Sequence, residues 1–193
     1  MDEATPTDLA PLREPPAAPQ VATHNFRFSE DYDLYPSGAK TKYKNNVMAI
    51  KLLKQIELEK RTATPEEQII LARYVGWGGL ANAFSSTASG WENEYQELKS
   101  LLTDVEYKAA MNSTITAYYT EPDLIRHIYR ALERFGFEGG PDRKILDPGM
   151  GTGNFYSVLP EQFQGSKLFG VELDSITGRI AKQLYPKADI TVA

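Results

Sequence analysis

The sequence has no cysteine and only two histidines among its 193 residues. The lack of cysteine excludes a disulfide framework and thiolate metal sites. The histidines, His24 and His127, stand alone without a paired acid, so no metal is expected. No stretch approaches the roughly 18 consecutive apolar residues of a membrane span, and the first twenty residues lack the apolar segment of a signal peptide. These absences predict a cytoplasmic protein without a membrane segment.

Acids outnumber bases by 26 to 21, which gives a net charge of −5, but one block differs from the rest. Residues 37–61 contain seven bases and two acids, a local charge of +5. Lys40, Lys42 and Lys44 lie in this block, and they could contact a DNA backbone. The alternative is a solvated helix face, and the sequence leaves both possibilities open.

The chain divides into three predicted parts. Residues 1–27 are rich in proline, alanine and acids without periodicity, which favours a disordered leader. Residues 28–112 show helical spacing of apolar residues and two capping-box patterns, beginning at Thr64 and Thr103. The turn 76–79 (Gly-Trp-Gly-Gly) ends the second helix, and Trp77 is expected to fill the core rather than to stack on a base. An α-helical N-terminal region follows from these patterns.

Residues 113–193 alternate between helix and strand. Strands are expected at 144–147 and 167–172 and from residue 188, with a helix at 175–184 before the third strand. Single helices between strands indicate right-handed crossovers and a parallel sheet. The predicted fold class is therefore α/β, with the start of a Rossmann-like domain after the helical region.

The main chemical signal is a glycine-rich turn after the first strand. Residues 147–155 read D-P-G-M-G-T-G-N-F, and glycines at a strand-to-helix turn let a ligand approach the backbone closely. This geometry suits a phosphate or a carboxylate, and the spacing does not choose between them. The dinucleotide pattern G-x-G-x-x-G fails, because Asn154 replaces its third glycine. Glu172 ends the second strand, where a carboxylate can bind both hydroxyls of a ribose, so an adenosine-type ligand is expected.

These residues resemble the D-P-x-x-G-x-G-x-F cofactor motif of adenine-specific DNA methyltransferases. The resemblance implies a truncated class I fold with S-adenosyl-L-methionine as cofactor. It also implies a second cofactor element at residues 118–122 (Tyr-Tyr-Thr-Glu-Pro), although Thr120 could simply cap a helix. The cofactor-binding residues that the resemblance implies are Tyr119, Thr120, Pro122, Asp147, Pro148, Gly149, Gly151, Gly153, Asn154, Phe155 and Glu172.

The segments 74–80 and 173–181 are similar to the N-terminal part of the large methylase–helicase proteins of bacterial conjugative elements and phages. The resemblance implies transfer of a methyl group to adenine in DNA by a longer protein. The Asp/Asn-Pro-Pro-Tyr/Phe tetrapeptide of such enzymes does not occur in this sequence. We therefore expect an inactive fragment with no catalytic residue and with the first strand unpaired on one edge. The alternatives are a methyltransferase for RNA, protein or a small molecule, and a non-enzymatic module that binds DNA or a partner.

Overall fold

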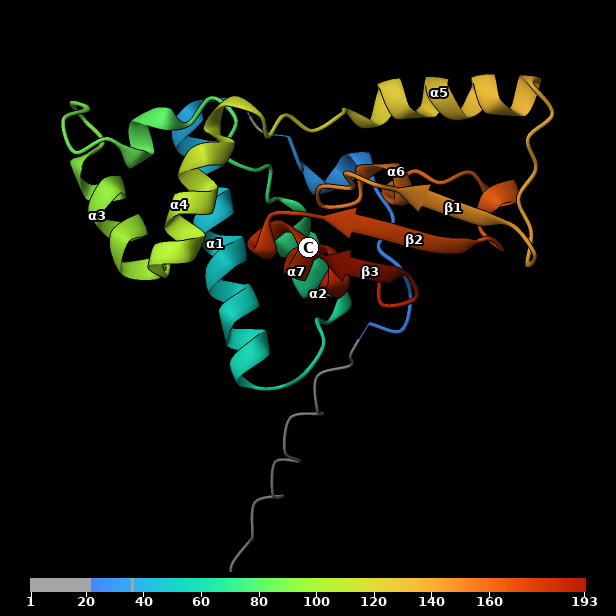
Figure 1. Ribbon diagram of the computed structural model, residues 1–193, viewed down its shortest axis with the longest axis horizontal. Coiled ribbons are helices and arrows are strands. Elements are labelled where there is room, and N and C mark those ends of the chain that lie inside the picture. Colours follow the sequence, from blue (N-terminus) through green and yellow to red (C-terminus); the bar gives the residue numbers. More distant parts are fainter. Residues whose placement is uncertain (1–21, 36) are drawn as a thin grey trace, which may run out of the picture.

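The computed structural model describes residues 22–35 and 37–193, in which helices dominate and the strands form one small sheet (Figure 1). The N-terminal part consists of α1 (Ala39–Leu58), α2 (Pro65–Ala72), α3 (Glu92–Leu101) and α4 (Asp104–Asn112). The C-terminal part consists of α5 (Pro122–Arg134), β1 (Lys144–Asp147), α6 (Asn154–Ser157), β2 (Lys167–Glu172), α7 (Ser175–Leu184) and β3 (Asp189–Val192). Short 3-10 turns occur at Glu30–Tyr32, Ala81–Phe84, Ser113–Ile115 and Glu161–Phe163. No helix of the described residues is long and apolar enough to cross a membrane.

Short-range sequence signals account for the helices of the N-terminal part. In α1 the apolar residues recur every three or four positions, and the stripe that they form is buried; it comprises Tyr43, Val47, Ile50, Leu53 and Ile56. The capping boxes predicted at Thr64 and Thr103 are both confirmed. In each box the threonine hydroxyl accepts a backbone N–H, and a glutamate three residues later accepts the threonine N–H.

The sheet is parallel, with the strand order β1-β2-β3. The strands predicted at 144–147 and 167–172 and the helix predicted at 175–184 are confirmed, and the third strand begins one residue later than expected. In the described chain β1 pairs with β2 alone, so its other edge is unpaired.

The predicted fold class, a truncated Rossmann-like methyltransferase fold, is wrong. The described residues form seven α-helices and a sheet of three strands, whereas a Rossmann fold has helices on both faces of a larger parallel sheet. Here α7 covers one face, and the crossover between β1 and β2 is the four-residue α6. The other face carries Leu146, Phe169 and Val171, and Leu146 is 61% exposed.

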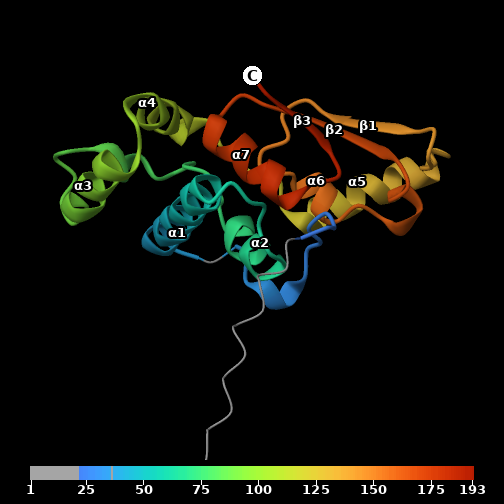
Figure 2. The same ribbon diagram turned by 90° about the horizontal axis from the view of Figure 1, so that it is seen from below.

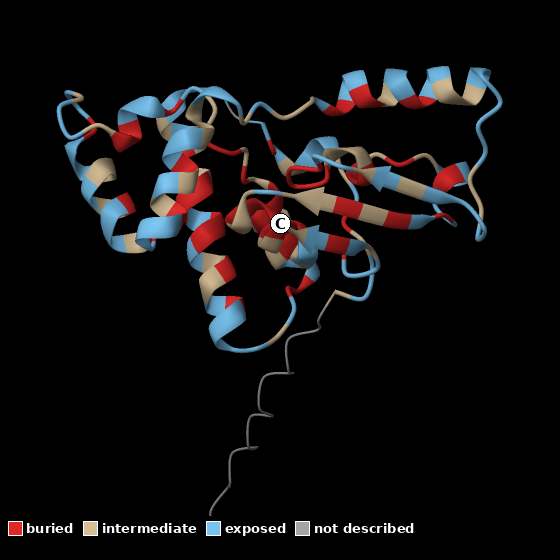
Figure 3. Ribbon diagram, viewed as in Figure 1, coloured by how far each residue is buried: buried red, intermediate tan, exposed pale blue. Residues whose placement is uncertain are grey.

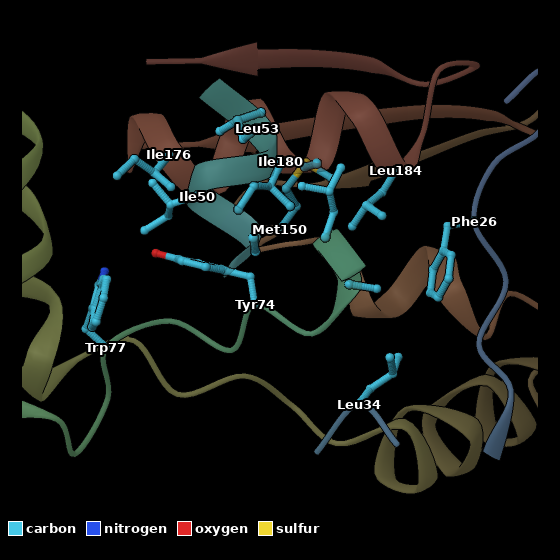
Figure 4. Close-up of a cluster of buried hydrophobic side chains, with 14 of the residues drawn as sticks. Phe26, Leu34, Ile50, Leu53, Tyr74, Trp77, Met150, Ile176, Ile180 and Leu184 are labelled. Carbon is cyan, nitrogen blue, oxygen red and sulfur yellow. The ribbon is translucent and has the colours of Figure 1, made fainter. Parts of the chain in front are cut away.

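Helix α7 joins the two parts of the chain into one core. It lies between the sheet on one side and α1 and α2 on the other (Figure 2). Its buried residues Ile176 and Ile180 lie close to Ile50 and Leu53 of α1 (Figure 4). Burial is strongest along these contacts, whereas the outward side of α5 is exposed (Figure 3). The helical part therefore supplies the second layer over the sheet.

The segment before α1 packs along this core. The backbone N–H of Phe26 donates to the Leu184 carbonyl over 2.7 Å, and the ring of Phe26 is buried. The N–H of Phe28 donates to the Ser157 carbonyl over 2.9 Å. The predicted disordered leader covered residues 1–27: residues 22–27 are part of this packed segment, and residues 1–21 lie outside the described residues.

An ion-pair network around the buried Glu106 fastens α7 to α1 and α4. The Arg179 guanidinium donates to both carboxylate oxygens of Glu57, over 2.8 and 2.9 Å, and to Glu106 over 2.9 Å. Lys54 also donates to Glu106, over 2.9 Å. Burial acts to raise the pKa of Glu106, but hydrogen bonds from Thr103, Arg179 and Lys54 outweigh it and lower the pKa from 4.5 to about 2.

Replacing Glu106 with glutamine is expected to lower the free energy of unfolding at pH 7 by about 2 kcal/mol, because Arg179 and Lys54 lose their charged partner. The depressed pKa fixes the pH dependence. The contribution of Glu106 is complete above pH 4.5 and is lost as the pH falls towards about 2. Urea unfolding of wild type and Glu106→Gln at a series of pH values measures this difference.

Glu66→Gln serves as the control, because Glu66 is an exposed acid on the first turn of α2. It should leave stability unchanged within about 0.5 kcal/mol. A difference between wild type and Glu106→Gln that persists undiminished down to pH 2 would contradict this account.

Candidate functional site

The glycine-rich loop leaves β1 and returns the chain to α6. Gly151 has a φ of 56° and Gly153 a φ of 86°, both in the left-handed region that favours glycine. The carbonyl of Gly153 accepts the Tyr185 hydroxyl over 2.8 Å, and the ring of Tyr185 covers the position that a side chain would occupy. Gly153 therefore belongs to the buried floor of the loop.

Met150 anchors the loop to β2. Its backbone N–H donates to the Val171 carbonyl over 3.1 Å, and its side chain lies against Gly170, where a Cβ would collide with the sulfur. Figure 4 shows Met150 in the same buried cluster as Ile180 and Tyr74. The absence of a side chain at Gly170 thus sets the height of the loop above the sheet.

Glu172, at the end of β2, joins the loop to the start of α7. One carboxylate oxygen accepts the Gly151 N–H over 2.8 Å, and the other accepts the Asp174 N–H over 2.8 Å. Asp174 in turn caps α7 by accepting the Thr177 N–H over 2.8 Å. Each oxygen of Glu172 keeps a further acceptor position, so the carboxylate is oriented and still able to bind.

A cavity of about 460 Å³ opens between the loop, the end of β2 and the segment before α5. Its size lies in the usual range for small-molecule sites. The predicted site residues that line it are Tyr119, Thr120, Asp147, Gly149, Gly151, Asn154, Phe155 and Glu172.

Three predicted residues do not line the cavity. Pro122 is buried at the first turn of α5, Pro148 is exposed on the loop, and Gly153 faces Tyr185. Thr120 precedes the cap position of α5, which Glu121 occupies without a capping hydrogen bond from its side chain. The backbone carbonyl of Thr120 accepts the side-chain amide of Asn154 over 3.0 Å, so this segment is attached to the loop.

Sequence reasoning missed most of the wall that the helical part contributes. Tyr74 and Gly76 come from the turn after α2, and Ala109 and Asn112 come from the end of α4. The remaining lining residues are Ser113, Thr116, Ala117, Tyr118, Met150, Leu173, Asp174 and Thr177. The glycines of the turn 76–79 were a usable signal: a Cβ at Gly78 would collide with the Ala117 carbonyl, which shows that this turn lies against the wall.

The cavity is negatively charged. Asp147, Glu172 and Asp174 line it, and no lysine, arginine or histidine of the described residues does so. Burial raises the pKa of Asp147, and a single hydrogen bond from the Gly149 N–H, over 3.3 Å, opposes the shift only in part.

Four backbone donors of the loop are also occupied. The N–H groups of Gly149, Met150, Gly151 and Gly153 all donate within the protein. Binding of a phosphate requires free N–H groups or basic side chains. The spacing left a phosphate and a carboxylate both open, and the four occupied N–H groups together with the acidic lining disfavour a phosphate at this loop.

The candidate DNA-contacting lysines lie on α1, and one of them is already engaged. Lys40 pairs with Glu94 over 2.6 Å and lies 4.0 Å from the ring centroid of Trp91. Lys42 is partly buried and Lys44 is exposed. Contact with DNA through these residues stays a prediction.

Trp77 was expected in the core, and this residue is 1% exposed.

Comparison with known proteins gives one distant relative. The chain is 24% identical over 148 residues to the protein named Defense against restriction protein B of Escherichia phage P1. The matched region covers 77% of this chain and 5% of that protein, so the chain spans a small fraction of its relative. No family model matches the chain, and no solved structure matches it.

These findings correct the expected family. Assignment to the adenine-specific DNA methyltransferases, and to the methylase–helicase proteins among them, is wrong: no family model supports it, and the relative found bears the name of a restriction-defence protein. The resemblance rested on short segments: the strand-to-helix turn 147–155, Glu172, and residues 74–80, 118–122 and 173–181. At such a turn glycines are favoured for conformational reasons in many proteins.

Gly170→Ala is expected to lower the free energy of unfolding by about 1–3 kcal/mol, because the new methyl group collides with Met150 beneath the loop. Gly165→Ala is the matched control, since the nearest atom to its Cβ would be 3.7 Å away. Thermal unfolding followed by circular dichroism compares the two variants. Equal melting temperatures would show that Met150 does not depend on Gly170.

Proposed function

We propose that the cavity binds an adenosine-containing small molecule without phosphate groups, and that S-adenosyl-L-methionine is the first ligand to test. The observation that carries the proposal is Glu172, a carboxylate held by two backbone N–H groups at the end of a parallel strand, beside a glycine-rich turn. A carboxylate in this position can accept both hydroxyls of a ribose.

The charge of the cavity supports a cationic ligand over a nucleotide. S-adenosyl-L-methionine has a net charge of +1, because it carries a sulfonium, an ammonium and one carboxylate group. Asp147, Glu172 and Asp174 would attract its two cationic groups by simple Coulomb interaction, whereas a nucleotide has a net negative charge. Asp147 accepts one hydrogen bond, from Gly149, and keeps acceptor positions for an ammonium group. The rings of Tyr119 and Phe155 also line the cavity, and aromatic faces attract cations.

Any reaction that uses the bound ligand is proposed for a longer protein of which this chain would be a part. Methyl transfer to adenine in DNA stays a prediction, with RNA, protein and small molecules as alternative acceptors, and we assign no catalytic residue. The name of the phage P1 relative adds a role in defence against restriction as a second hypothesis.

Isothermal titration of the protein with S-adenosyl-L-methionine should give saturable binding with one site per chain. ATP and NAD should bind at least about tenfold more weakly, because their phosphates meet three carboxylates and no basic residue. Glu172→Ala should weaken binding of S-adenosyl-L-methionine at least about tenfold, because it removes the charged acceptor proposed for the two ribose hydroxyls.

Glu161→Ala is the control, an exposed acid on the 3-10 turn Glu161–Phe163, away from the cavity. Circular dichroism at the titration temperature establishes that both variants are folded. Equal affinity for ATP and S-adenosyl-L-methionine, or unchanged affinity in Glu172→Ala, would refute the proposal.

A further inference from the structure

The ring of Tyr119 lies across two glycines from distant parts of the sequence. A Cβ on Gly76 would lie 3.1 Å from the Tyr119 hydroxyl oxygen and 3.2 Å from Cζ. A Cβ on Gly151 would lie 3.2 Å from Cε1 and 3.3 Å from Cδ1 of the same ring. The ring therefore sits between the turn after α2 and the glycine-rich loop, and a side chain at either glycine would push the ring out of its present position.

The hydroxyl of Tyr119 is linked to Glu172 through Thr177 and Asp174. It lies 3.4 Å from Thr177 Oγ1, which donates to Asp174 Oδ1 over 2.6 Å. The Asp174 N–H donates to Glu172, and Glu172 accepts the Gly151 N–H. These contacts form a closed circuit of cavity-lining residues, in which Tyr119 and Glu172 each touch both the loop and the start of α7.

The turn behind Tyr119 is itself fixed by α1. Asn46 is fully buried, and its side-chain amide donates to the Gly76 carbonyl over 2.6 Å. Its side-chain oxygen accepts the Val75 N–H over 2.9 Å. One buried side chain thus satisfies the Val75 N–H and the Gly76 carbonyl at the start of the turn, which gives the turn a defined position relative to the core.

From these contacts we infer that Tyr119 is a positioning residue, which transmits the position of the turn after α2 to Gly151 and Thr177 and so orients the carboxylate of Glu172. The inference rests on the proposed function. The helical part of the chain is then a component of the ligand site. Moving the Tyr119 ring weakens ligand binding even though Glu172 and Asp147 are unchanged.

Two glycines of the turn 76–79 provide a matched test. Gly76 has a φ of 70° and Gly79 a φ of 74°, so alanine strains the backbone similarly at both. At Gly76 the new Cβ meets Tyr119 and, at 3.3 Å, the Cβ of Ala117, whereas at Gly79 it meets nothing within 4 Å. We expect Gly76→Ala to weaken binding of S-adenosyl-L-methionine about tenfold and Gly79→Ala less than about twofold.

A double-mutant cycle separates the Tyr119 ring from the contact with Ala117. If Gly76→Ala acts by displacing the ring, it should have little further effect in a Tyr119→Ala background, so the two losses should not add. Tyr119→Phe keeps the ring and removes the hydroxyl, and it should weaken binding less than Tyr119→Ala does. Additive losses from Gly76→Ala and Tyr119→Ala would overturn the inference.

A measurement without ligand distinguishes failure of this inference from failure of the proposed function. In amide NMR spectra of the free protein, Gly76→Ala should shift the resonances of Gly151 and Thr177, and Gly79→Ala should leave them in place. If the wild type binds no S-adenosyl-L-methionine while these shifts appear, the proposed ligand is wrong and the positioning role holds. If the resonances do not move in Gly76→Ala, the positioning role is wrong.

Discussion

The burial of α7 on both of its sides is the constraint on which the fold and the cavity depend. Gly178 lets the helix approach the sheet so closely that a Cβ there would lie 2.6 Å from a methyl group of Val192 and 3.4 Å from Cβ of Glu172. On the opposite side Ile176 and Ile180 meet α1. The first turn of the same helix carries Asp174 and Thr177 to the cavity. Packing that stabilises the core therefore also fixes one wall of the site.

The glycine-rich loop has a different role from the one its sequence suggests. Glycines at a strand-to-helix turn commonly expose N–H groups to a phosphate. Here the N–H of Gly151 is held by Glu172, and the space above its Cα is filled by Tyr119. The space at Gly153 is filled by Tyr185. Side chains of the protein thus bind the Gly151 N–H and pack against both glycines, and the carboxylates of Asp147, Glu172 and Asp174 line the cavity beside the loop.

Much of the local structure could be predicted, because capping boxes, apolar periodicity and strand–turn–helix patterns act over a few residues. Examples are the capping boxes at Thr64 and Thr103 and the strands that end at Asp147 and Glu172. Alternation of helix and strand does not reveal how many strands pair or which faces are covered, and the Rossmann-like assignment failed for that reason. Tyr119 lies against both Gly76 and Gly151 and so joins three distant segments. The glycines of the turn 76–79 signal a close approach, but no local pattern identifies Tyr119 and Gly151 as the partners.

Glu172 is oriented before any ligand arrives, and this matters for affinity. Its carboxylate already accepts one N–H on each oxygen, so its rotamer freedom has been restricted during folding rather than on binding. A ribose that used the remaining acceptor positions would meet a fixed partner. The same arrangement makes Glu172 a structural link between Gly151 and Asp174, so its removal affects the loop as well as the ligand. Tyr119 and Gly76 are the positions at which the orientation of the carboxylate can be disturbed while the carboxylate itself is retained.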